Sequence, residues 1–433
     1  MDPTSLVAVA LCVFAFGLLS HRIESTPLTA PMLFVAAGFV AGPGGLDVLS
    51  LEGGAAEVVI ELTLVLVLFS DASRIRVREL RRGYALPARL LLVGLPLTIA
   101  LGAVLGRVLF PALSWPELAL LAAVLAPTDA ALGQVVVSSP RVPVRIRQAL
   151  NVESGLNDGI AVPVVTVFLA AAAAGATGGV HDGGGGLGFA AAQIGLGPVA
   201  GLLVAGPAGW LVQRAAAARS INRTFENLAG LSIALGAFGT AELIGGNGFI
   251  AAFTAGLVIG NTTSSVCARL QEFAEDEGQL LALIAFLAFG ATLLPQALEA
   301  LGWRAGLYIA LSLTAARMVP VALALVGSGL RAPSVAFLGW FGPRGLATIL
   351  FALLVAEAEA IPNHELLVQL VTLTVAVSTL AHGVTAAPLA SAYGRWAERL
   401  RARAPERPEC GEAPDLPVRV RLRAQRSGGR QVA

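Results

Sequence analysis

The sequence is poor in charged and sulfur-containing residues. It has no lysine, so all 29 basic residues are arginine, which we attribute to codon bias rather than to function. Charged residues make up only 13% of the chain, whereas a soluble domain carries roughly 25%. The three cysteines (Cys12, Cys267 and Cys410) are scattered, without metal-ligand or redox spacing. These shortages exclude an ordinary soluble protein and give no support to a metal or redox centre.

Long apolar stretches dominate the chain instead. Hydrophobic residues make up 56% of the 433 residues, and stretches of about 20 apolar residues recur from end to end. The first stretch lacks a basic region before it and a cleavage site after it, so we expect a retained helix rather than a signal peptide. Hydropathy and helix breakers predict an all-α polytopic membrane protein with about 13 transmembrane helices. The predicted spans are 4–21, 27–43, 57–71, 84–109, 115–138, 147–174, 187–213, 224–244, 247–261, 278–297, 303–327, 333–356 and 365–392.

Arginine is confined almost entirely to alternate loops. It follows the odd-numbered spans, whereas acidic or glycine-rich sequence follows the even-numbered ones, with Arg107 and Arg304 as exceptions near helix ends. Because positive residues stay on the cytoplasmic side, the pattern predicts an inner-membrane protein with its N-terminus outside and its C-terminus in the cytoplasm. The cytoplasmic loop arginines are then Arg22, Arg74, Arg76, Arg78, Arg81, Arg82, Arg141, Arg145, Arg147, Arg214, Arg219, Arg223, Arg269 and Arg331.

Composition and helix breakers divide the chain further. Residues 1–394 are predicted to form the membrane domain, and residues 395–433 a poorly ordered, Arg- and Pro-rich cytoplasmic tail that contacts anionic lipid headgroups. Within the membrane domain, the fifth and twelfth spans are interrupted at Ala126-Pro-Thr-Asp129 and Gly342-Pro-Arg-Gly345. Paired interrupted helices in two halves of a chain are typical of inverted repeats that surround a transporter's binding site.

The first interruption carries candidate ion ligands. Pro127 has no backbone N–H and frees a carbonyl, so Ala126-Pro-Thr-Asp129 can unwind locally. An unwound turn offers bare carbonyls and the Thr128 hydroxyl, which are hard oxygen ligands, and Asp129 adds a carboxylate. The alternative is a simple kink with an acid at the cytoplasmic end of the helix.

The sixth span begins with a second group of polar residues, Glu153, Ser154, Asn157 and Asp158. Ser154 and Asp158 are four residues apart and share one helix face, whereas Glu153 points elsewhere. An ionisable group at this depth costs several kcal/mol unless it is paired or hydrated, so Asp158 is a functional candidate by default. We expect Asp158 to face Asp129.

Two arginines also lie deep inside predicted spans, far from the span ends. Arg317, in the middle of the eleventh span, requires an acidic partner. We expect a structural ion pair with Glu153. Arg344, at the second interruption, can offset helix-dipole ends or carboxylate charge. Arg344 is the alternative partner of Glu153, with Arg317 favoured.

These motifs resemble the monovalent cation:proton antiporter-1 family, the NhaP-type prokaryotic sodium/proton antiporters. The resemblance covers about residues 4–394 and rests on Thr-Asp, Glu-Ser-x-x-Asn-Asp-Gly, the arginine of the eleventh span and Gly-x-Arg-Gly. It implies a homodimer with a dimerisation domain and a six-helix core, about residues 84–174 and 303–392, that works by an elevator-like shift. It also implies a cation site whose ligands are the Thr128 main chain, Asp129, Ser154 and Asp158, with Asn157 where relatives with adjacent aspartates have Asp.

Other polar residues receive smaller roles. The resemblance implies an acid near a cytoplasmic funnel on the third span, for which Asp71 is favoured over Glu61, and both remain possible interfacial residues. Glu242 and His382 are isolated polar residues of predicted spans. We expect them to be hydrogen-bonded within the bundle rather than to act in transport.

The predicted function is exchange of sodium or lithium for protons, which compete for Asp158 and Asp129. Two close carboxylates raise each other's proton affinity, and burial raises it further. Asn157 in place of a second adjacent acid implies, by resemblance, electroneutral exchange. The alternatives are a potassium/proton antiporter on the same scaffold and an intramembrane aspartyl protease. The sequence has no nucleotide-binding motif, so we expect an ion gradient as energy source and no cofactor. The expected partners are a second copy, the bilayer, and the transported cation and protons, with no nucleic acid.

Overall fold

The computed structural model describes residues 3–23, 26, 28–49, 55–75, 85–129, 132–176, 185–262, 265–299, 301–404 and 406–411. Arg76, Arg78, Arg81, Arg82 and residues 412–433 lie outside them, as do the side chains of Arg223, Cys267, Arg269 and Cys410. Within the described residues every regular element is helical. The elements are α1 (Pro3–Ile23), α2 (Ala30–Ala41), α3 (Ala55–Ser73), α5 (Ala85–Arg89), η1 (Leu90–Gly94), α6 (Leu95–Leu109), α7 (Trp115–Val124), α8 (Gln134–Val137), α9 (Val144–Ala176), α10 (Gly185–Ala217), α11 (Arg223–Leu243), α12 (Gly248–Asn261), α13 (Ser265–Glu299), α14 (Trp303–Leu313), α15 (Ala315–Ala324), α16 (Ala332–Trp340), α17 (Leu346–Ala356), α18 (His364–Arg403) and η2 (Pro408–Cys410).

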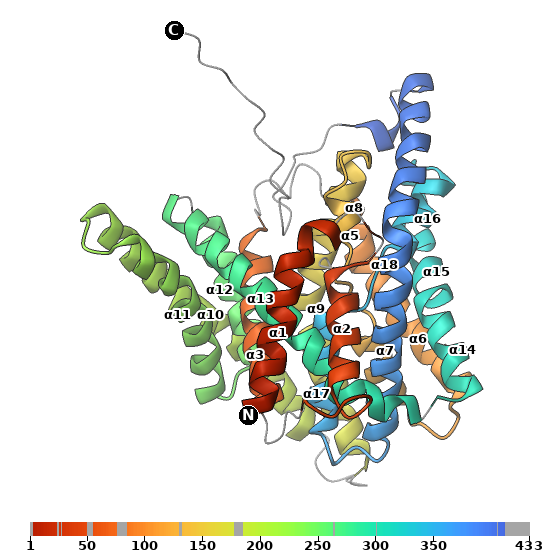
Figure 1. Cartoon of the computed structure of the whole chain (residues 1–433), viewed down its shortest axis with the longest axis horizontal. Coiled ribbons are helices and arrows are strands. Elements are labelled where there is room, and N and C mark those ends of the chain that lie inside the picture. The colour runs from red at the N-terminus through yellow and green to blue at the C-terminus, as the bar shows by residue number, and fades with distance from the viewer. Residues whose placement is uncertain are drawn as a thin grey trace.

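The helices pack into one bundle (Figure 1). Among the described residues, seven helices are long and apolar enough to cross a membrane, and five shorter apolar helices accompany them. Large apolar side chains face outward on many of them; Phe14 and Leu18 of α1, for example, are 64% and 70% exposed. An apolar outer surface on a helical bundle is expected of a protein solvated by lipid. The structure therefore confirms an all-helical membrane protein, while the count of thirteen spans and the inverted repeats stay predictions.

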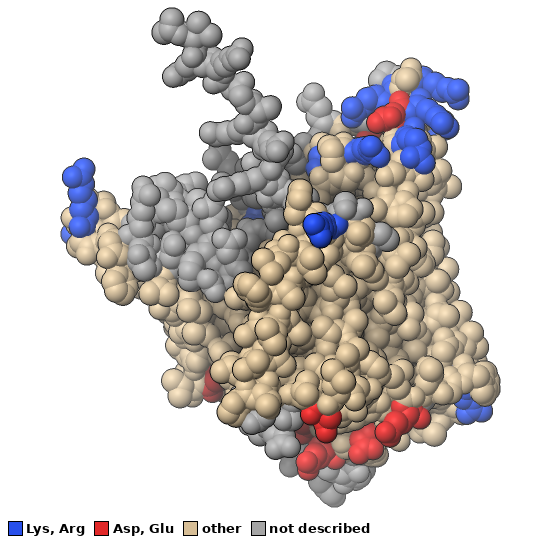
Figure 2. All heavy atoms as spheres, viewed as in Figure 1, with Lys and Arg blue, Asp and Glu red and all other residues tan. Residues whose placement is uncertain are grey.

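Charge is segregated between the two ends of the bundle. On the face shown in Figure 2, arginines gather at the end where α18 finishes, and acidic side chains gather at the opposite end, below α17, with one basic patch there beside α14. These two ends are called the arginine end and the acidic end. The same asymmetry underlies the positive-inside rule.

Two pairs of half-helices cross in the middle of the bundle. The half-helix α7 ends at Val124 and α8 begins at Gln134, while α16 ends at Trp340 and α17 begins at Leu346. The non-helical segments touch, because the Asp129 backbone N–H donates to the carbonyl oxygen of Pro343 at 2.8 Å. The half-helices α7 and α17 lie toward the acidic end, and α8 and α16 toward the arginine end (Figure 1). Both predicted interruptions are confirmed.

Glycine allows the scaffold helices to pack closely. A Cβ on Gly38 of α2 would lie 2.0 Å from the carbonyl oxygen of Leu287 in α13, and one on Gly256 of α12 would lie 2.2 Å from that of Phe69 in α3. In lipid, helices associate largely through such close backbone contact, since the hydrophobic effect does not drive them together. This requirement accounts for part of the glycine content of the chain.

The C-terminal helix differs from the prediction. The last span was predicted to end at residue 392 and to be followed by a poorly ordered tail, but α18 continues to Arg403. Its buried residues keep a helical spacing beyond that point, with Tyr393, Ala397 and Leu400 facing the bundle. Average hydropathy conceals this narrow stripe, because most of the other positions there are arginine or glutamate.

After α18 the chain folds back onto the bundle. The fully buried Glu409 accepts hydrogen bonds through Oε1 from the Arg331 backbone N–H (2.7 Å) and the Ser334 hydroxyl (3.2 Å). Arg145 Nη1 donates to the carbonyl oxygen of Pro408 at 2.9 Å. Since Arg331 is the N-cap of α16, a carboxylate here satisfies a free donor and complements the helix dipole. Residues 406–411 are thus part of the folded bundle rather than of an extended tail.

Removing this cap is expected to destabilise the protein. In Glu409→Ala the hydrogen-bond donors at the start of α16 stay buried but lose their acceptor, Oε1. This lowers the free energy of unfolding by about 1–3 kcal/mol. We expect a lower thermal unfolding temperature for Glu409→Ala in detergent. Glu406→Ala, an exposed position in the same turn, is the matched control and should unfold like the wild type. Equal unfolding temperatures for the two variants would contradict a stabilising role for Glu409.

Candidate functional site

Thr128 is the hub of the polar cluster at the first interruption. The Ser154 hydroxyl donates to the Thr128 carbonyl oxygen, and the two hydroxyl oxygens lie 3.2 Å apart. Asn157 Nδ2 donates to Thr128 Oγ1 at 2.7 Å. All three residues are at most 5% exposed. The unwound turn after α7 is therefore held against the face of α9 that carries the predicted ligands.

Asp129 lies at the start of α17. Its Oδ2 accepts the backbone N–H of Leu346 at 2.9 Å, so the carboxylate of one interrupted helix caps the N-terminus of the other. Negative charge is stabilised at a helix N-terminus. This contact was not predicted from the sequence. The sequence contains one indication of it. Gly345 directly precedes an apolar run, a pattern compatible with a helix that starts there without a side-chain cap of its own.

Arg344 donates hydrogen bonds to free carbonyl oxygens at the C-terminal end of α7. Its Nη1 donates to the freed carbonyl oxygens of Ala126 (3.1 Å) and Pro127 (3.2 Å). Its backbone N–H donates to the Ser378 hydroxyl at 2.7 Å. The guanidinium is 1% exposed and lies at the negative end of the α7 dipole. This is one of the two arrangements that the sequence left open for Arg344.

Glu153 pairs with Arg317 rather than with Arg344. Arg317 Nη1 and Glu153 Oε1 lie 2.6 Å apart, and the side chains are 1% and 3% exposed. The pair links α15 to α9 immediately beside the Thr128 cluster. The geometry agrees with the partner that we favoured; that the pair serves structure rather than ion binding stays a prediction.

The two glycines of Gly342-Pro-Arg-Gly345 make room for the site. A Cβ on Gly342 would lie 2.6 Å from Arg317 Nε, and one on Gly345 would lie 2.0 Å from Asp129 Oδ2. Pro343 between them accepts the Asp129 backbone N–H. Pro343 therefore contacts Asp129, and the two glycines leave space for Arg317 and Asp129.

Asp158 lies on the same helix face as Ser154 and directly follows Asn157. Its side chain is 6% exposed, so the carboxylate is buried within the bundle. A cavity of about 10 Å³ opens beside Asp129 and Ser154, and Phe341 and Pro343 help to close it. A cavity of this size has room for roughly one water-sized particle. The contacts of Thr128 thus bring the Asp129 segment to the face of α9 that carries Asp158.

The two funnel candidates are separated by the structure. Asp71, 7% exposed, lies near the arginine end of α3, where its carbonyl oxygen is 4.0 Å from the position of a Cβ on Gly155. Glu61 is exposed and within electrostatic reach of Glu242 and Glu357. Only Asp71 is close to the polar part of α9, so the position of Glu61 gives no support to a role at the same entrance.

The two isolated polar residues are hydrogen-bonded within the bundle. Glu242 Oε1 accepts the Gly248 backbone N–H at 2.8 Å at the start of α12. His382 contacts the carbonyl oxygens of Ser378 and Trp340, each at 2.9 Å. His382 therefore ties α18 to the end of α16, as a structural residue would.

A Cβ at position 345 is expected to disturb the site without altering its chemistry. In Gly345→Ala the new carbon would overlap Asp129 Oδ2, so the carboxylate must move away from the α17 N-terminus. We expect a weaker apparent cation affinity in proteoliposome flux assays, with the protein still folded. Gly306→Ala, where nothing lies within 4 Å of the new carbon, is the matched control. Equal affinities in the two variants would show that the position of Asp129 does not matter for the cation.

An all-helical membrane bundle in which two broken helices cross beside buried carboxylates belongs to the class of polytopic secondary transporters. Comparison with known protein families identifies which one. A family described as "Sodium/hydrogen exchanger, transmembrane" matches residues 7–392, which is well over half of the chain, and the chain belongs to that family. This confirms the resemblance drawn from the motifs. A family of transporters gives no support to the intramembrane aspartyl protease.

Individual relatives are more distant. The chain is 28% identical over 389 residues to the K(+)/H(+) antiporter NhaP2 of Shewanella oneidensis, covering 88% of this chain and 66% of that protein. It is 25% identical over 402 residues to the K(+)/H(+) antiporter NhaP of Alkalimonas amylolytica, covering 92% and 67%. The chain thus spans 66% and 67% of the lengths of these two relatives. The solved structure of the sodium proton antiporter MjNhaP1 from Methanocaldococcus jannaschii at pH 8 shares the fold, with a TM-score of 0.71, 20% identity and coverage of 90% and 98%.

Proposed function

We propose that this protein exchanges a monovalent cation, sodium or lithium, for protons across the membrane. The observation that carries the proposal is the contact of the unwound turn at Thr128 with Ser154 and Asn157, between two segments that each bear a buried acid. Membership of the sodium/hydrogen exchanger family supports the same conclusion. The site residues are Asp158, Asp129, Ser154, Asn157 and the main chain of Thr128.

The mechanism is competition between a proton and a cation. With Asp158 and Asp129 ionised, their oxygens, the Ser154 hydroxyl and the Thr128 carbonyl hold a dehydrated cation. Uptake of one proton by this pair of carboxylates releases it, so the loaded site carries the same charge with either ion. An empty, doubly negative site does not cross, because moving uncompensated charge through an apolar barrier is very unfavourable. Only a loaded site changes sides, which couples the two ions.

Sodium and lithium are the favoured cations because the motifs resemble those of sodium/proton antiporters. The proposed ligands are carboxylate, hydroxyl and carbonyl oxygens, which are hard ligands suited to these ions. Potassium is the second candidate, because the relatives from Shewanella and Alkalimonas carry the name K(+)/H(+) antiporter.

The remaining features of the proposal follow from the resemblance and from charge. We propose a homodimer in the inner membrane, with the arginine end in the cytoplasm and the acidic end outside (Figure 2). The six-helix core, about residues 84–174 and 303–392, moves in an elevator-like step. Exchange is one-for-one, since Asn157 is neutral. Asp71 serves the cytoplasmic entrance, and the Glu153–Arg317 pair holds the core together.

Proton flux driven by each alkali cation tests the proposal. We expect purified protein in liposomes to collapse a pH gradient when sodium or lithium is added, at lower concentrations than potassium requires. A membrane potential imposed with an ionophore should leave the rate unchanged if exchange is electroneutral. Half-saturation by potassium below that by sodium would establish the second candidate. No response to any of the three cations would refute cation/proton exchange.

A further inference from the structure

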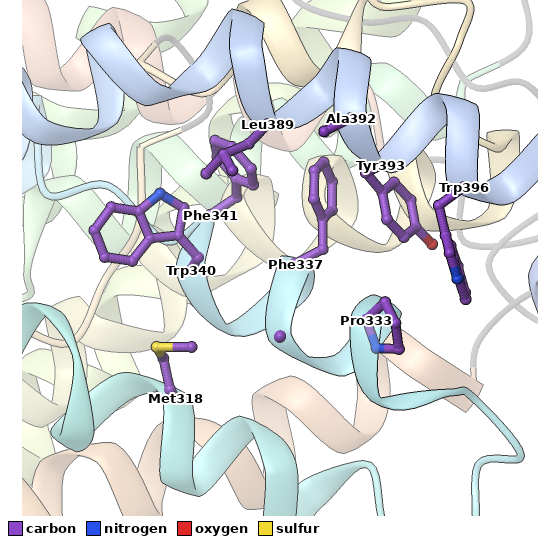
Figure 3. Close-up of a pocket in the computed structure, with 10 residues that line it drawn as sticks. Met318, Pro333, Phe337, Trp340, Phe341, Leu389, Ala392, Tyr393 and Trp396 are labelled. Atoms are coloured by element: carbon purple, nitrogen blue, oxygen red, sulfur yellow. The ribbon is translucent and has the colours of Figure 1, made fainter.

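An apolar groove opens on the side of the bundle behind the second interruption. It lies between α15, α16 and α18 and has a volume of about 460 Å³ (Figure 3). That volume is within the range of roughly 300–1,000 Å³ typical of ligand pockets. Phe337 and Tyr393 stack with ring centroids 4.2 Å apart, and Tyr393 stacks in turn on Trp396 at 5.4 Å. Phe337 comes from α16 and the other two rings from α18, so the stack joins these two helices along the groove.

Two polar side-chain groups of the groove are already hydrogen-bonded within the protein. Trp340 Nε1 donates to the Thr385 hydroxyl at 3.0 Å, and the Tyr393 hydroxyl pairs with that of Ser334 at 2.9 Å. The other side chains that line the groove include Met318, Leu389 and Ala392, which offer hydrocarbon or sulfur only. The groove therefore fits a flexible hydrocarbon rather than a polar ligand.

At the end of the groove toward the arginine end of the bundle, three exposed arginines are close in sequence to residues that line the groove, and Glu398 lies between two of them. Arg331 is the N-cap of α16, two residues before Pro333 of the groove wall. Arg395 and Arg399, both exposed, flank Trp396 on α18, in the region where Figure 2 shows arginines gathered at the end of that helix. Tryptophan and arginine together are typical of the membrane interface, where arginine pairs with phosphate.

We propose that this groove binds one acyl chain of an anionic phospholipid, with its phosphate at the rim formed by Arg331, Arg395 and Arg399. An apolar surface alone defines no site on a protein solvated by lipid. The concave shape and the charged rim together single out this groove. A second copy of the chain is not the expected occupant of the groove, since a flat helix face does not fill a groove lined by aromatic rings.

The bound chain would lie directly behind the ion site. Phe341 lines both the groove and the small cavity beside Asp129, so it forms a partition between the two. Met318 of the groove follows Arg317 in the chain, and Arg317 pairs with Glu153. An occupant of the groove therefore supports the side of the interruption that faces away from the cation.

Binding is tested by native mass spectrometry on the purified full-length protein, delipidated and titrated with phosphatidylglycerol or phosphatidylcholine of identical acyl chains. We expect one tightly held phosphatidylglycerol per chain and about tenfold weaker binding of phosphatidylcholine. Glycerol phosphate, which has the headgroup without the chains, should not compete.

Two variants separate the groove from the rim. Ala392→Trp fills the groove, and we expect it to lose the tightly held lipid; Ala387→Trp, exposed on the same helix but outside the groove, should keep it. Arg395→Gln with Arg399→Gln should abolish the preference for phosphatidylglycerol while the protein stays folded. Equal lipid binding by the two tryptophan variants would overturn the proposal. Cross-linking that places a second copy, or residues 412–433, in the groove would also overturn it.

Discussion

Asp158→Asn is expected to abolish cation-driven proton flux and to leave the protein folded. Asparagine has the shape of aspartate, but it neither takes up a proton from water near neutral pH nor neutralises a bound cation. The side chain at this position is 6% exposed, so solvent cannot compensate for the missing negative charge of the carboxylate. The measurement is the quench and recovery of a pH-sensitive dye in proteoliposomes after addition of sodium. We expect the signal of protein-free vesicles.

A matched control distinguishes loss of the site from loss of charge in general. Glu61→Gln removes an exposed carboxylate on α3, which interacts electrostatically with Glu242 and Glu357. We expect near wild-type flux from that variant and similar unfolding temperatures for both. Sodium-driven proton flux that persists in a folded Asp158→Asn protein would refute the proposed exchange site.

The candidate residues could be predicted because their signals are local in the sequence. Polar residues inside apolar stretches require a reason for their burial, and the spacing of Ser154 and Asp158 places them on one face of a helix. A proline within an apolar run predicts an interruption at Ala126-Pro-Thr-Asp129. These inferences use physical rules that apply within a few residues.

The contacts between distant segments could not be predicted in the same way. Asp129 caps a helix that begins at Leu346, and Arg344 satisfies the carbonyls of Ala126 and Pro127, across more than two hundred residues. A local sequence pattern does not indicate which arginine side chain donates a hydrogen bond to which freed carbonyl oxygen. The burial of Glu409 was missed for a related reason, because its environment is created by α16 and α18 and not by its polar neighbours in sequence.

Arg317→Ala is expected to cause a larger loss of stability than removal of the Glu409 cap. Removal of one partner leaves Glu153 as an uncompensated charge that is 3% exposed, which costs about 3–5 kcal/mol. We expect little folded protein after expression and a strongly lowered unfolding temperature in detergent. Arg304→Ala is the matched control, since Arg304 is exposed and lies over the face of Trp303 in a cation–π interaction. An Arg317→Ala protein as stable as the Arg304→Ala protein would contradict the structural importance of the pair.

The double variant Glu153→Gln, Arg317→Met separates a structural pair from a role in ion binding. It removes both charges at similar volume, and replacement of a buried pair by uncharged residues is often neutral or stabilising. Recovery of folded protein with unchanged cation affinity would assign the pair to structure, with Asp158 and Asp129 as the charges that bind the ion. If Glu153→Gln alone folds well and shifts the cation affinity, Glu153 belongs to the ion shell, and the charge count that implies electroneutral exchange must then include a third carboxylate.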